Sequence, residues 1–136
     1  MTTSTSPKLN ESTDSLLRIA MRADAILSGI TGVVLLALGR QVAELSGTTA
    51  AVEYATGASF VVFGLVVLAV ATRPRIRAAG FALAVGNALF SVATVAVVVI
   101  GVWPLTDTGV LLVLGTGVYT LVMAALQYAG VRRIRG

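Results

Sequence analysis

The sequence contains neither cysteine nor histidine. These absences exclude disulfides, thiolate nucleophiles, imidazole bases and the usual soft-metal ligand sets. Charged residues are also scarce, at 12% of the 136 residues, whereas 57% are hydrophobic and the mean hydropathy is +0.94. A water-soluble domain needs much more polar surface than this. We therefore expect an integral membrane protein that is not an enzyme and that uses no metal or cofactor.

Long uncharged runs are what the chain has instead. The clearest, residues 78–103, is long enough to cross the roughly 30 Å hydrocarbon core of a bilayer. Three further runs resemble it, and short turn-forming segments separate them. The sequence predicts an all-α, up-down-up-down bundle of four transmembrane helices within residues 16–136. The expected spans lie near 19–41, 51–72, 77–101 and 107–129.

The ends of these helices are also predicted. Residues 1–15 are rich in Ser and Thr, so we expect a disordered cytoplasmic tail there. Asp14 or Ser15 would cap the first helix, and Thr106 or Asp107 the fourth, because short polar side chains accept first-turn amides. Pro74 would lie in the first turn of the third helix.

The basic residues predict the orientation of the bundle. All but Arg40 of the ten fall on one side of the predicted membrane. The positive-inside rule then places both termini in the cytoplasm, here of a bacterial inner (plasma) membrane. Topology explains this charge better than nucleic-acid binding does. Arg73, Arg75 and Arg77 are also candidates for contact with anionic lipid, although their topological role is sufficient.

An internal repeat is a further hypothesis. When the chain is shifted by 63 residues, Asp24, Ser28 and Thr31 align with Asn87, Ser91 and Thr94. Their spacing follows one face of a helix. The chain would then consist of two similar helical hairpins. Chance is the alternative, because small and apolar residues dominate the composition.

Three polar residues form the candidate ligand-binding site: Asp24, Asn87 and Gln127. Antiparallel packing of the third and fourth helices would bring Asn87 near Gln127, with Asp24 in the same layer. The layer could bind a small polar or cationic solute, or it could simply hold the helices together. Asp24 would be paired with a basic residue or solvated by headgroups. The possible basic partners are Arg18, Arg77 and Arg132.

Three segments resemble a group of small bacterial integral membrane proteins, frequent in actinobacteria and without assigned activity. These segments are LLRIAMRADAILSGITG, GNALF at 86–90 and ALQYAGVRR at 125–133. The resemblance covers residues 16–133. It implies a four-helix fold with Asp24, Asn87 and Gln127 as characteristic polar positions, and no catalytic residues.

Two functions remain open at this point. The first is a non-enzymatic accessory or self-associating component of a membrane assembly, present as a homo-oligomer or in a larger complex. Very short loops and small-residue seams on the helices motivate it. The alternative is a small-solute transporter or binding protein with a cytoplasm-facing polar site at Asp24, Asn87 and Gln127.

Overall fold

The computed structural model describes the backbone of residues 5–134 and the side chains of residues 13–134. This part of the chain contains four helices and no strand. The helices are α1 (Thr5–Ser46), α2 (Ala50–Val70), α3 (Arg77–Ile100) and α4 (Asp107–Arg133). Each is long and apolar enough to cross a membrane. The prediction of an all-α four-helix bundle is confirmed, and the chain is a multi-pass membrane protein.

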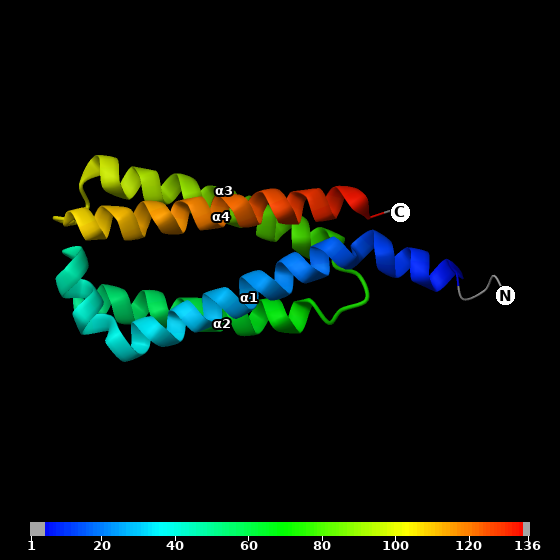
Figure 1. Cartoon of the computed structure of the whole chain (residues 1–136), viewed down its shortest axis with the longest axis horizontal. Coiled ribbons are helices and arrows are strands. Elements are labelled where there is room, and N and C mark those ends of the chain that lie inside the picture. The colour runs from blue at the N-terminus through cyan, green and yellow to red at the C-terminus, as the bar shows by residue number, and fades with distance from the viewer. Residues whose placement is uncertain (1–4, 135–136) are drawn as a thin grey trace.

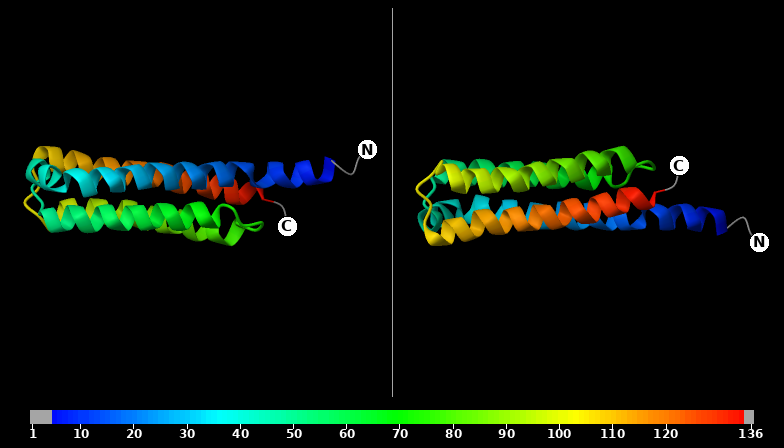
Figure 2. Two further views of the ribbon diagram at one scale, coloured as in Figure 1. Left: turned by 90° about the horizontal axis from the view of Figure 1, so that it is seen from below. Right: turned by 90° about the horizontal axis from the view of Figure 1, so that it is seen from above.

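The helices run up, down, up and down, as Figures 1 and 2 show. The start of α1, the end of α4 and the α2–α3 turn lie at one end of the bundle, which we call the terminal end. The α1–α2 and α3–α4 turns lie at the opposite end, which we call the far end. Observed bounds of α2 and α3 agree closely with the predicted spans.

The predicted start of the first helix is wrong. Thr5–Ser15, expected to belong to a tail, lies in α1, and residues 1–4 of that predicted tail lie outside the described part of the chain. Asp14 does not cap the helix but forms an ion pair with Arg18, one turn later and 2.9 Å away. Such a pair stabilises a helix from within, which explains why the segment continues the helix rather than ending it.

Two other helix ends can be compared with the predictions. Thr106 caps α4, because its hydroxyl accepts a hydrogen bond from the Gly109 amide at 3.0 Å, as predicted. Pro74 lies in the α2–α3 turn and not in the first turn of α3, which begins at Arg77. The turn is longer than expected because it places Ile76, 2% exposed, into the apolar core at the terminal end.

Packing between the helices is uneven around the bundle. α1 packs along α2 and also against α4, and α3 packs along α4. α2 and α3 are connected in sequence but make little backbone contact along their length. The bundle therefore consists of two hairpins, α1–α2 and α3–α4, joined on the α1–α4 side and open on the α2–α3 side (Figure 1).

Contacts at the far end join the two hairpins. The Thr106 amide donates a hydrogen bond to the Ser46 carbonyl at 3.0 Å, and the Thr106 hydroxyl donates to the Leu45 carbonyl. Both carbonyls belong to the last turn of α1, where a helix leaves its carbonyls without intrahelical partners. The α3–α4 turn thus caps the end of α1.

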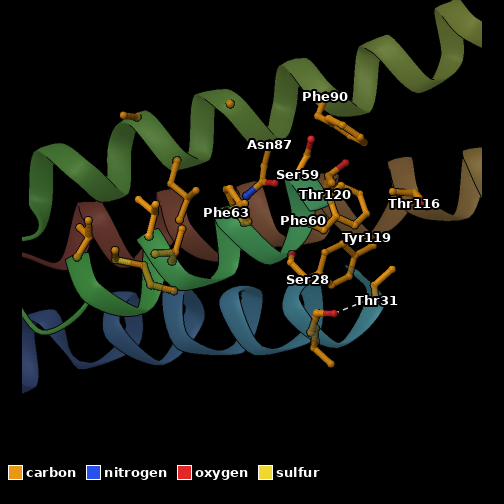
Figure 3. A pocket seen from close by; sticks show the side chains of 18 of the residues that line it. Ser28, Thr31, Ser59, Phe60, Phe63, Asn87, Phe90, Thr116, Tyr119 and Thr120 are labelled. Carbon is orange, nitrogen blue, oxygen red and sulfur yellow. Dashed lines mark hydrogen bonds between the residues drawn. The ribbon is translucent and has the colours of Figure 1, made fainter. Parts of the chain in front are cut away.

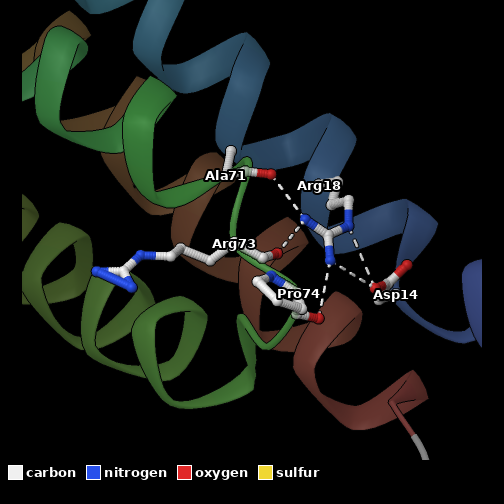
Figure 4. Close-up of polar contacts among 5 residues, drawn as sticks. All are labelled: Asp14, Arg18, Ala71, Arg73 and Pro74. Carbon is white, nitrogen blue, oxygen red and sulfur yellow. Dashed lines mark hydrogen bonds and ion pairs between the residues drawn. The ribbon is translucent and has the colours of Figure 1, made fainter.

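Arg18 joins the segments at the terminal end (Figure 4). Its guanidinium donates to the carbonyls of Ala71 and Arg73, both at 2.7 Å, and of Pro74 at 3.1 Å. Asp14 holds the same guanidinium from the other side. Arginine suits this position because its planar fork carries several donors at fixed angles. The side chain therefore satisfies carbonyls of the turn that follows α2.

Replacement of Arg18 should destabilise this end of the bundle. We expect Arg18→Gln to lower the free energy of unfolding by about 2 kcal/mol, because hydrogen bonds from a charged donor are lost. Arg22→Gln is the matched control: Arg22 is exposed one turn further along α1, and the change should stay within about 0.5 kcal/mol. Equal unfolding midpoints in detergent for both variants would contradict this role of Arg18.

Candidate ligand-binding site

A cluster of polar side chains is buried between α1, α3 and α4. Its members, which we call the polar cluster, are Asp24, Ser28, Asn87, Tyr119 and Gln127. The Asp24 carboxyl group is its centre: one oxygen accepts from the Asn87 amide at 2.9 Å and the Gln127 amide at 2.8 Å. The other accepts from the Tyr119 hydroxyl at 2.8 Å and the Ser28 hydroxyl at 3.2 Å. The Asn87 amide also donates to the Gln127 side-chain oxygen at 2.8 Å.

Burial makes these bonds energetically important. Asp24 is 1% exposed and Gln127 is fully buried. A polar group taken out of water costs free energy unless it is hydrogen-bonded, and a carboxylate costs the most. Four donors on one carboxyl group compensate for that loss. The cluster thereby ties three of the four helices together, since Asp24 and Ser28 come from α1, Asn87 from α3, and Tyr119 and Gln127 from α4.

The prediction that Asn87 meets Gln127 in one layer with Asp24 is confirmed. The expected partner of Asp24 is wrong, however. Within the described residues Asp24 forms no ion pair, and its four partners are neutral. Arg18 is unavailable because it lies six residues back on another face of α1 and binds the α2–α3 turn instead. The expectation that headgroups solvate Asp24 also fails, because the side chain is buried.

Tyr119 is the member that sequence reasoning missed. It lies eight residues before Gln127, a spacing that turns it by about 80° around α4 relative to Gln127. The spacing was therefore only a weak signal. Its long side chain allows a residue two turns away to reach the same carboxyl group, which spacing alone does not indicate.

A large cavity adjoins the polar cluster on the open side of the bundle (Figure 3). Its volume is about 1020 Å³, and its walls come from all four helices. Phe60, Phe63 and Phe90 line it, and the rings of Phe60 and Phe90 approach each other from α2 and α3 with centroids 6.3 Å apart. The lining is mainly apolar. The cavity lies where the α2 and α3 backbones make little contact.

The members of the polar cluster differ in their relation to this cavity. Asn87, Ser28 and Tyr119 line it, whereas Asp24 and Gln127 lie behind them. Of the three predicted ligand-binding residues, the structure thus places only Asn87 at the cavity wall.

The hypothetical internal repeat can be compared with the packing of the helices. Its equivalent positions, Asp24 and Asn87, are in direct contact, but the α1–α4 packing has no equivalent between α2 and α3.

Among the described residues, no charged side chain lines the cavity. Within the described residues, no group of three or more Asp, Glu, His or Cys side chains could hold a metal ion. A second, smaller hollow of about 560 Å³ lies at the terminal end, between α3 and α4, and is lined by Arg77, Arg132, Tyr128, Phe81 and Val131. The Arg132 guanidinium lies 5.9 Å from the centre of the Tyr128 ring.

In comparisons with known proteins, no family model, curated protein or solved structure matches the chain. The assignment of a function therefore depends on the polar cluster, the cavity and the opening between α2 and α3.

Proposed function

We propose that the protein is a non-enzymatic membrane protein that binds a lipid-soluble molecule in the cavity between its two hairpins. The observation that carries this proposal is the cavity of about 1020 Å³ on the side where the α2 and α3 backbones make little contact and the Phe60 and Phe90 rings approach each other. Ligand sites are typically mainly apolar concavities of about 300–1,000 Å³ with a few polar groups. This cavity is at the upper end of that range and has the same composition.

The surroundings of the cavity favour entry from the bilayer. Both hairpins have apolar, exposed faces over the length of the spans, as expected of helices in contact with lipid. An opening between two such helices meets hydrocarbon rather than water. A small polar solute, as considered from the sequence, fits less well, because Asp24 and Gln127 are already engaged in the polar cluster and do not reach the cavity.

Filling the cavity with a side chain tests the proposal. Gly86 lines the cavity, and a Cβ atom added there would meet nothing within 4 Å. Gly86→Phe should therefore leave the fold intact while occupying the space of the bound lipid-soluble molecule, which we call the guest. We expect it to reduce the amount of guest that co-purifies with the protein by about tenfold or more, the equivalent of about 1.4 kcal/mol. Organic extraction and mass spectrometry measure this amount.

Leu89→Phe is the matched control on the same helix. Leu89 is 64% exposed and does not line the cavity, so this variant should retain the guest. Equal retention by both variants, or no retained molecule in the unaltered protein, would contradict the proposal. A different result, in which Gly86→Phe changes the oligomeric size, would favour the other function, an accessory or self-associating protein whose second copy closes the α2–α3 side.

Orientation and lipid contact belong to the same proposal. The terminal end carries the arginines, so we place both termini in the cytoplasm of a bacterial plasma membrane. Anionic lipid headgroups are proposed to bind at this end. Of the three arginines predicted for this contact, Arg77 shares a hollow with Arg132 rather than with Arg73 or Arg75. A pair of guanidinium groups beside an aromatic ring suits a phosphate group.

A further inference from the structure

We infer that the guest carries an uncharged hydrogen-bond donor such as a hydroxyl group on an otherwise apolar chain. This inference rests on the proposed function and narrows the class of molecule. Its basis is the direction of the polar hydrogens around the cavity. Every one of these hydrogens points to an acceptor of the protein. The polar groups of the cavity wall therefore present only oxygen lone pairs to the cavity.

The hydroxyl groups of the cavity wall show this direction clearly. Three of them donate to a carbonyl four residues earlier in their own helix: Thr31 to Leu27, Ser59 to Ala55 and Thr116 to Leu112. The other hydroxyls of the wall are also engaged. Thr120 donates to the Gly117 carbonyl, and Ser28 and Tyr119 donate to the Asp24 carboxyl group. A hydroxyl retains acceptor capacity when its hydrogen is used.

Asn87 is the strongest of these acceptors. Its amide nitrogen has two hydrogens, and both are used, one on Asp24 and one on Gln127. Its side-chain oxygen forms no hydrogen bond with any described residue. The oxygen nevertheless retains some accessible surface, since no fully buried side-chain oxygen or nitrogen in the described part of the chain is without a partner. Because Asn87 lines the cavity, this free acceptor faces the cavity.

The apolar part of the cavity wall determines the chemistry of the guest outside its donor group. Phe60, Phe63 and Phe90 and many aliphatic side chains surround the polar floor, and no charged residue is among them. An alkyl chain loses nothing on leaving lipid for such a wall. A donor group gains, because hydrocarbon offers it no acceptor. An ester, ether or ketone would bring a second acceptor to the Asn87 oxygen, leaving both oxygens unpaired.

Matched probes test this inference on the full chain in phosphatidylcholine nanodiscs. The probes are decanol and decyl methyl ether, both radiolabelled, with binding to empty nanodiscs subtracted. Both are uncharged and carry the same decyl chain, and only decanol has a donor. We expect decanol to bind about tenfold more tightly than the ether, because the ether leaves the Asn87 acceptor unpaired. Gly86→Phe should abolish the binding of both, and Leu89→Phe should not.

The outcomes distinguish the inference about the donor from the proposed function. If the ether binds as tightly as the alcohol and Gly86→Phe removes both, the guest needs no donor and this inference is wrong, whereas the proposed function stands. If no probe binds above the empty nanodiscs, the proposed function fails and the inference fails with it. Tight binding of the alcohol alone, lost in Gly86→Phe, supports both.

Discussion

Asp24→Leu should lower the free energy of unfolding by about 2 to 4 kcal/mol. The reason is that one substitution removes the acceptor shared by Asn87, Gln127, Tyr119 and Ser28. Interhelical hydrogen bonds in membranes average about 0.6 kcal/mol, so the three from Asn87, Tyr119 and Gln127 account for most of the lower value. Donors left unpaired in a buried site raise the cost further. Unfolding of the purified protein by SDS in mixed micelles, followed through the fluorescence of Trp103, measures the change.

Two variants serve as controls for this experiment. Glu44→Leu removes an exposed carboxyl group from the same helix and should change stability by less than about 0.5 kcal/mol. In the double variant Asp24→Leu/Gln127→Leu, one orphaned donor is removed together with its acceptor. Its cost should be less than the sum of the single costs, because residues of one network are not independent. An additive double variant would show that Asp24 and Gln127 do not form the network described here.

Gly32→Ala should destabilise the protein by about 1 to 3 kcal/mol, the usual cost of overpacking. A Cβ atom at Gly32 would lie 2.5 Å from the Gly57 carbonyl oxygen and 2.9 Å from the Val61 nitrogen. Both atoms belong to the backbone of α2, so neither can move without shifting that helix. The two helices are in backbone contact here, which is possible only because glycine occupies the position. The same SDS titration measures the effect.

Gly29→Ala provides the control from one helical turn earlier. A Cβ atom at Gly29 would meet nothing within 4 Å. This substitution should be neutral, or stabilising by up to about 1 kcal/mol, because alanine favours a helix more than glycine does. The two alanine variants differ only in position along α1. Similar stabilities for both would mean that α1 and α2 do not approach as closely as described.

Much of the fold follows from local pattern. Four uncharged runs of membrane length leave few alternatives for a chain of this size, because every backbone polar group in lipid must be satisfied within a helix. The cap at Thr106 follows from its side chain and the apolar run that comes after it. The start of α1 did not follow, because the contact of Arg18 with the α2–α3 turn depends on residues far along the chain, although its ion pair with Asp14 is local.

The candidate site was also predictable only in part from the sequence. Spacing on single helices places Asn87 and Gln127 at one depth, and their hydrogen bond confirms it. Spacing does not show what Asp24 binds. The sequence suggested an arginine on the principle that opposite charges pair, but a carboxyl group accepts neutral donors equally well when several converge on it. Tyr119 entered the cluster through the length of its side chain.

By itself the sequence determined the number of spans, the turns between them and the depth at which the polar residues lie, because these depend on contacts between neighbours in the chain and on the apolar solvent. Only the tertiary structure decided which helices pack side by side. α1 and α4 pack against each other, whereas a cavity lies between α2 and α3. If the two hairpins were equivalent repeats, the α1–α4 and α2–α3 contacts would be alike. The difference arises because Asp24, Asn87, Gln127 and Tyr119 hold α1, α3 and α4 together and no polar contact of this kind draws in α2 within the described chain.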